Sequence, residues 1–317
     1  MALSKIQTSE MLDTPNLGRR NLVINGAMSI NQRAATSGIT SGYFVDRFQL
    51  SGVSASAVIT SSTPTEFPTA ITVSATSGNP IILQKIESKM VQHLSGKVVT
   101  VSFYAKNISN ATTLYTSLQY AGSADNFGST TTISEQNLGN LTTDWVKYTA
   151  SWTVPAGGLN GLSLNILCAG SSTFTMGVTG VQLEVGDTAT DFEHRSYGEE
   201  LSLCQRYYQS YGRDTSAPFR INGSGNGSNT MLTGFMYPME MRATPSMNYF
   251  GGNTDGGNIN VYVGATTVVT TGASSADAGK YAVRWNFAGS GSHTDGCYWI
   301  DVGTGSTQMG WTMDSEL

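Results

Sequence analysis

The chain has 317 residues, of which 36 are glycine and only 12% are charged, about half the charged share usual in globular proteins. Ser, Thr, Asn and Gly replace the missing charge, and these residues favour turns over helix interiors. The net charge of −5, with no basic cluster, argues against nucleic acid as the main partner. No apolar run reaches the ~18 residues of a membrane-spanning helix, and the N-terminus lacks the apolar core of a secretion signal.

Residues 1–20 form a polar leader with no lasting apolar period. Pro15 and Gly18 interrupt any helix there. We expect this segment to be disordered or to act as a docking peptide.

Residues from 21 onward are predicted to form strands. The clearest strand is 145–154, in which alternate residues are apolar: Val146, Tyr148, Ala150, Trp152 and Val154. This period of two predicts a strand with one buried face. Trp152 is therefore predicted to lie in the core, whereas Trp145, at the strand end on the opposite face, is open to either interpretation.

Residues 97–106 and 162–168 repeat this alternation. In 174–185 the apolar phase slips by one residue at Thr179–Gly180, which predicts a β-bulge that bends the strand. Short strands separated by Gly and Ser indicate an antiparallel sandwich rather than a fold of alternating strands and helices.

Residues 197–212 interrupt the strand pattern and are predicted to form a linking helix. Leu201, Cys204 and Tyr208 recur at helical spacing, and Ser196 with Glu199 fits a capping box. The alternative is an extended linker. Alternating residues return after Gly212, so residues 213–317 are predicted to form a second, smaller antiparallel β domain.

Seven segments resemble, in their order and spacing, a module common in bacteriophage tail fibres and related virion appendages. They are RNLVINGAMSINQR (20–33), YFVDRF (43–48), QKIE (84–87), SGKVVTVSFYAK (95–106), DWVKYTASWTVP (144–155), GVQLEVGDTATDFEHR (180–195) and EELSLCQRYY (199–208). The ending WTMDSEL (311–317) also resembles the ending of such proteins. The module is itself similar to the jelly-roll carbohydrate-binding modules of polysaccharide-degrading enzymes.

The resemblance implies an all-β protein: a jelly-roll sandwich over residues 21–196, the linking helix, and the second β domain as a receptor-binding tip. It further implies a structural virion protein, made in the host cytoplasm and placed in the tail, whose leader docks on other virion proteins. Such a protein would form a homotrimer and attach to host-surface glycans without inserting into a membrane. The alternatives are a head-decorating or capsid fibre protein, and a free carbohydrate-binding module.

The sequence predicts no enzymatic activity, no metal site and no cofactor. Its three histidines do not occur in a zinc-binding pattern. A glycosidase would need two carboxylates across a cleft. The candidate pairs each have a structural explanation: Asp191 with Glu193, Glu199 with Glu200, and Asp314 with Glu316.

Related carbohydrate-binding modules often hold a structural calcium through an acidic residue after an Asn–Gly pair. Here Asn25–Gly26 is followed by Ala27 and Met28, so that acid is missing. Asp187 and Asp191 leave a structural calcium site open as an alternative in a later loop.

Sugar binding needs flat aromatic rings that stack on pyranose faces, with polar groups that reach the hydroxyls. The second β domain is rich in such rings. The candidate glycan-binding residues are therefore Trp285, Tyr298, Trp299, Trp311 and Tyr249.

Overall fold

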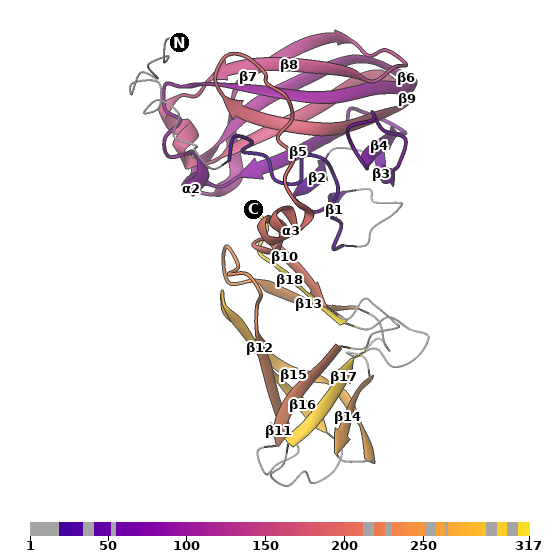
Figure 1. Ribbon diagram of the computed structural model, residues 1–317, viewed down its shortest axis with the longest axis vertical. Helices are drawn as coiled ribbons and strands as arrows, with labels where there is room; N and C mark the ends of the chain where they lie inside the picture. The colour runs from indigo at the N-terminus through magenta and orange to yellow at the C-terminus, as the bar shows by residue number, and fades with distance from the viewer. Residues whose placement is uncertain are drawn as a thin grey trace, which may run out of the picture. The chain divides into compact units, whose positions relative to one another are not determined.

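A computed structural model describes residues 19–33, 41–51, 55–211, 219–225, 230–250, 258–263, 266–289, 297–302 and 310–317. The chain divides into two compact units, Met1–Glu200 with Leu317, and Leu201–Glu316. Both are built mainly from antiparallel strands (Figure 1). The predicted all-β class is therefore confirmed. Of the predicted leader, residues 1–18 lie outside the described residues.

In the first unit the described residues form nine strands and two short helical segments. The strands are β1 (Gly42–Val45), β2 (Phe48–Ser51), β3 (Ala55–Thr60), β4 (Ala70–Ala75), β5 (Ile81–Ile86), β6 (Val98–Ser123), β7 (Asn126–Asn140), β8 (Val146–Thr153) and β9 (Leu162–Val185). The helical segments are α2 (Ser88–Val91) and the 3-10 helix η1 (Ala156–Asn160). Within the described ranges no helix is long and apolar enough to cross a membrane.

The two longest strands, β6 and β9, pair with each other along most of their length and run through both layers of a sandwich (Figure 1). One layer, sheet A, has the order β3-β4-β9-β6-β8, and the other, sheet B, has the order β1-β2-β5-β9-β6-β7. Register shifts between Asn107 and Thr113 mark the point where both strands pass from one sheet to the other. This arrangement is the jelly-roll sandwich that the resemblance implied.

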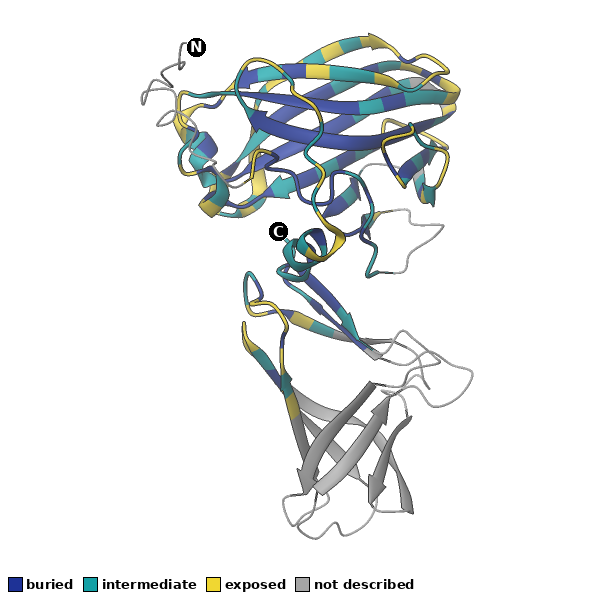
Figure 2. Ribbon diagram, viewed as in Figure 1, coloured by how far each residue is buried: buried dark blue, intermediate teal, exposed yellow. Residues whose placement is uncertain are grey.

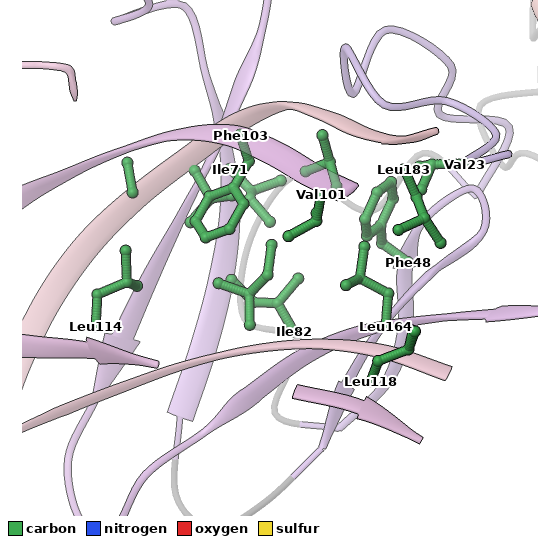
Figure 3. Close-up of a cluster of buried hydrophobic side chains, with 14 of the residues drawn as sticks. Val23, Phe48, Ile71, Ile82, Val101, Phe103, Leu114, Leu118, Leu164 and Leu183 are labelled. Atoms are coloured by element: carbon green, nitrogen blue, oxygen red, sulfur yellow. The ribbon is translucent and has the colours of Figure 1, made fainter. Parts of the chain in front are cut away.

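The core lies between the two sheets, and their apolar side chains point toward one another (Figure 3). Val101 and Phe103 on β6 come from sheet A, and Leu118 on the same strand comes from sheet B. Burying each such side chain contributes roughly 1.5–3 kcal/mol. Trp152 also lies in this core, as its alternation predicted.

The predicted bulge in 174–185 is present. Ser102 pairs with Gln182 and Tyr104 pairs with Thr179, so β9 has one more residue than β6 between these two pairs. Gly180 takes the positive φ angle of 63° at this point. A side chain at Gly180 would also collide with the ring of Phe67, 2.5 Å from the position of its Cβ.

The N-terminal segment 19–33 lies against the sandwich through buried polar contacts. The Asn21 side chain accepts the amide of Leu183 at 3.1 Å and donates to the carbonyl of Val181 at 3.2 Å. Gly26 sits where a Cβ would lie 2.0 Å from that same carbonyl oxygen. The close approach of the two backbones therefore requires glycine at the second position of the Asn25–Gly26 pair.

The other motifs contribute to the same buried network. The Asn25 amide nitrogen Nδ2 donates to the carbonyls of Ile30 and Asp46, both at 2.9 Å. Asp46 and Arg47 are buried, and Arg47 donates to the carbonyl of Lys85 at 2.6 Å. The Asp–Arg pair in VDRF therefore joins strands of the fold, as a structural interpretation of that motif predicted.

In the second unit the described residues form nine strands, and α3 (Tyr197–Gln205) spans the point in the chain where the first unit ends and the second begins. The strands are β10 (Tyr208–Tyr211), β11 (Phe219–Gly225), β12 (Thr230–Met236), β13 (Ser246–Phe250), β14 (Asn258–Val263), β15 (Thr266–Ala278), β16 (Ala282–Gly289), β17 (Cys297–Val302) and β18 (Gly310–Asp314). They form a three-stranded sheet, β10-β18-β13, and a closed barrel, β11-β12-β16-β15-β14-β17.

The predicted linking helix of residues 197–212 is wrong beyond Gln205. The Ser196 cap is present, because its hydroxyl accepts the amide of Glu199 at 3.3 Å. Residues 208–211 instead form β10, where Tyr208 pairs with Asp314 and Tyr211 pairs with Trp311. Pairing with the C-terminal strand overrides the helical spacing in this segment. Gly212, the predicted end of the helix, lies outside the described residues.

Candidate functional site

The outer face of sheet A is partly covered by the chain that follows β9. The buried Glu184 carboxylate accepts the backbone amide and the hydroxyl of Thr190, at 2.8 and 2.6 Å. Phe192 packs edge-on against Phe67 with ring centroids 5.0 Å apart. Phe192 therefore anchors this returning segment.

The outer face of sheet B is predominantly polar. On β9 the side chains of Leu164 and Ile166 enter the core, so Ser163 and Asn165 point outward. On β6, Leu118 enters the core and Ser117 and its alternate neighbours point outward.

Strand pairing aligns these outward residues in rows. Ser117 pairs with Asn165 on one side and with Glu135 on the other. In the next row, Gln119 pairs with Ser163 and with Thr132. We call this surface the polar face and define it by the outward residues Gln49, Leu83, Lys85, Tyr115, Ser117, Gln119, Thr130, Thr132, Glu135, Ser163 and Asn165.

Three small residues form the centre of the polar face. Ser117, Ser163 and Asn165 are only 3–4% exposed although they point away from the core. They are linked by hydrogen bonds from the Ser163 hydroxyl to Asn165 Oδ1 at 3.0 Å and from Asn165 Nδ2 to the Ser117 hydroxyl at 3.2 Å. These hydrogen bonds hold the three side chains in one arrangement beneath the more exposed part of the face.

The more exposed part of the polar face lies toward the edge strand β7. The Gln119 side chain donates to the Thr132 hydroxyl at 3.2 Å and accepts from the Thr130 hydroxyl at 3.0 Å. Glu135 is exposed, and Tyr115 is half-buried. The face therefore offers hydroxyl, amide and carboxylate groups together with the Tyr115 ring, which is a set suited to a polyhydroxylated ligand.

The acidic pairs considered for catalysis are used as structural partners. Glu193 accepts the amides of Arg20 and Asn21 at 3.0 and 2.8 Å and pairs with Arg195 at 3.0 Å. Burial opposes ionisation of Glu193, but these partners outweigh it and lower its pKa.

The other acids bond nearby groups in the same way. Glu200 accepts the amide of Asn25 at 2.6 Å, and Glu199 pairs with Arg19 at 3.2 Å. Asp314 accepts the amide of Glu316 at 2.9 Å. The residues that the structure describes contain no cluster of three or more metal-ligating side chains.

Trp311 is not a glycan platform. It is 1% exposed and lies in β18, the central strand of the three-stranded sheet, between Tyr211 and Tyr249. Its ring approaches that of Phe235, with centroids 6.3 Å apart. The prediction failed because β18 is the central strand of its sheet and one face of that strand is covered. A tryptophan on the covered face becomes part of the core.

For the other four predicted aromatic residues, the structure describes the backbone position and not the side chain. Tyr249 is in β13, Trp285 in β16, and Tyr298 and Trp299 in β17. Their side chains lie outside the described part of the chain (Figure 2). Their role as glycan ligands therefore stays a prediction.

The polar face was not proposed from the sequence. The signal for part of it is present, because Ser163 and Asn165 alternate with the apolar residues of 162–168. The segment TLYTSLQYA (113–121) carries a similar alternation. What one strand cannot indicate is that both sets of outward residues lie side by side in one sheet.

No family model and no curated sequence matches the chain. Among solved structures, the enzymatically active domain of bacteriophage CBA120 tailspike protein 4 is 16% identical with a TM-score of 0.36, over 52% of this chain and 21% of that one. The CBM22-1 and GH10 modules of a Clostridium thermocellum xylanase, complexed with xylohexaose, are 14% identical with a TM-score of 0.39, over 53% and 29%.

A third solved structure is the module TmCBM61 in complex with β-1,4-galactotriose. It is 12% identical, with a TM-score of 0.34, over 53% of this chain and 100% of that one. The match thus spans about a fifth of the tailspike chain and under a third of the xylanase chain. Likeness at these levels says nothing about what this chain binds.

Proposed function

We propose that the protein is a structural virion protein of a bacteriophage, a tail fibre or appendage subunit that attaches to host-surface glycan through the polar face. The observation that carries the glycan part is the more exposed side of the polar face, where Gln119 bonds the Thr130 and Thr132 hydroxyls and Tyr115 presents a half-buried ring. Fixed hydroxyl and amide groups next to an aromatic ring match the alternating polar and apolar surfaces of a sugar.

The virion part rests on the ordered set of sequence motifs. Their residues cluster in the buried network around Asn21, Asn25 and Asp46, which makes them determinants of the fold rather than of a reaction. We therefore propose a binding protein and not an enzyme. The expected result of incubation with soluble xylan or galactan is that no new reducing ends are released.

The glycan proposal is tested by Tyr115→Ala. Loss of the ring is expected to weaken binding of the full chain to neutral polysaccharides about tenfold. Affinity electrophoresis against a panel of soluble xylan, β-1,4-galactan and mixed-linkage β-glucan measures the change. Thr149→Ala, at an exposed position of β8 in sheet A, is the control and should leave retention unchanged. If no polysaccharide in the panel retains the wild type, or if Tyr115→Ala binds as the wild type does, the polar face is not the glycan site.

The virion proposal is tested by the oligomeric state of the protein and by its location on phage particles. We expect light scattering on the full chain to give the mass of three chains, and immunogold labelling to place it on the tails of purified particles. Labelling of heads would favour a head-decorating or capsid fibre protein. A monomer absent from particles would favour a free carbohydrate-binding module.

A further inference from the structure

Trp145 lies on the outer face of sheet A, immediately before β8. A Cβ placed on Gly177 would lie 2.8 Å from Cη2 of the indole, so the ring rests on the outer surface of β9 where a side chain is missing. The neighbours of Gly177, Met176 and Val178, are buried in the core. This confirms that Gly177 and the ring lie on the side of the sheet away from the core.

Lys106 lies beside the same ring. Its ammonium nitrogen is 5.0 Å from the centroid of the Trp145 ring and 3.3 Å from the Ser62 hydroxyl. Lys106 pairs with Gly177 in the β6–β9 ladder. Within the described ranges no carboxylate comes within ion-pair distance of this ammonium.

Trp145 differs from the other rings on this face. Phe67 packs against Tyr104 and Phe192, with ring centroids 5.5 and 5.0 Å apart. These rings form one cluster with His194, to which the segment that follows β9 contributes Phe192 and His194. Trp145 has no aromatic partner in the part of the chain that the structure describes, and it is half-buried.

Hydroxyl groups surround the lysine and the ring. Thr72 pairs with Gly177 on the side away from Lys106. In the neighbouring row the Ser74 and Thr175 hydroxyls are 3.1 Å apart. All three are half-buried rather than covered. The surface therefore combines one ring, one ammonium and several hydroxyls.

We propose that Trp145 and Lys106 form a second glycan-binding site, on the sheet opposite the polar face, for a sugar that carries a carboxylate, such as a hexuronate residue. The indole stacks against the C–H face of the pyranose. When the sugar binds, the Lys106 ammonium, which lies 5.0 Å from the ring centroid, turns from the ring and pairs with the carboxylate of the stacked sugar. The hydroxyls of Ser62 and Thr72 are placed to meet those of the sugar.

The test is isothermal titration of the full chain with tetragalacturonate and, for comparison, xylotetraose. We expect tetragalacturonate to bind and Trp145→Ala to abolish the binding. Lys106→Met is expected to weaken it about tenfold. The same Lys106→Met change should leave any binding of xylotetraose at this surface unaltered, because that sugar has no carboxylate. Lys89→Met, an exposed lysine on α2, is the matched control and should bind as the wild type does.

Trp145→Ala could lose binding because it misfolds. Lys106→Met avoids this problem, because it changes a surface lysine and keeps the ring. A wild type that does not bind tetragalacturonate overturns the proposal. Equal binding by wild type and Lys106→Met overturns the assignment of an acidic sugar. The two glycan sites fail independently, because Tyr115→Ala should leave the titration with tetragalacturonate unchanged while it weakens retention on neutral polysaccharides.

Discussion

Replacing Arg195 with methionine is expected to lower the free energy of unfolding of the first unit by about 3–5 kcal/mol. The Arg195 side chain is 4% exposed and pairs with Glu193 at 3.0 Å and with Glu200 at 3.3 Å. It also donates to the backbone carbonyls of Asn21 and Val23. Methionine keeps much of the volume but leaves two carboxylates and two carbonyls without their cation.

The matched control is Arg19→Met. Arg19 also pairs with a glutamate, Glu199 at 3.2 Å, but the two side chains are 50% and 40% exposed. Exposed pairs of this kind contribute about 0–1 kcal/mol. Urea unfolding of the full chain, followed by circular dichroism, measures both variants. Equal destabilisation by the two changes would contradict the role of Arg195.

The same cluster predicts a dependence of stability on pH. The pKa of Glu193 is lowered in the folded chain, because hydrogen bonds and Arg195 outweigh the effect of burial. A carboxyl group with a lowered pKa stabilises the fold above its unfolded pKa, and the contribution is lost as pH falls through the folded value. We therefore expect the wild type to lose stability below about pH 4.5 and Glu193→Gln to lose less over the same range.

Gln84→Leu is expected to cost about 2–4 kcal/mol, although the two side chains are similar in size. Gln84 is 1% exposed. Its amide group accepts the backbone amide of Ile24 and donates to the carbonyl of the same residue, both at 2.8 Å. These two hydrogen bonds replace those that a neighbouring strand would make with the backbone of Ile24. Leucine would leave both backbone groups buried and unpaired.

Gln119→Leu is the control for this change. Gln119 is also on sheet B, but its partners are the hydroxyls of Thr130 and Thr132 on the exposed side. Both hydroxyls can bond to water instead, so the expected loss is below about 1 kcal/mol. Thermal unfolding of both variants in the same buffer measures the difference in their stability. A Gln84→Leu variant as stable as Gln119→Leu would mean that water replaces the lost contacts.

Strands with one buried face could be predicted because their period is visible within a few residues. In β8 the inward positions Ala150 and Trp152 follow the alternation directly. The bulge at Gly180 was also visible, since a one-residue slip exchanges the two faces of a strand. In both cases all the information lies within one short segment.

Strand β7 could not be found in this way. Its inward apolar residues, Ile133 and Leu138, are five residues apart and lie at register shifts. At these bulges the extra residue breaks the period of two, and the rest of the strand is mainly Ser, Thr, Asn and Gln. The sequence of such an edge strand resembles that of a loop.

The buried network and the polar face were beyond sequence reasoning for a different reason. Asn21 bonds to Leu183, which lies 162 residues away, and Ser117 meets Asn165 only through the pairing of β6 with β9. Single residues of both sites look like ordinary polar positions. Only strand order, which is set by packing across the whole unit, brings them together.

Because β6 and β9 each belong to both sheets, the sandwich has no seam along which it can open. Separating sheet A from sheet B would require both strands to break at the bend near Asn107–Thr113. Partial unfolding of one sheet therefore exposes the edge of the other. Amide hydrogens deep in either sheet are then expected to exchange with solvent at one common free energy, as a single cooperative unit.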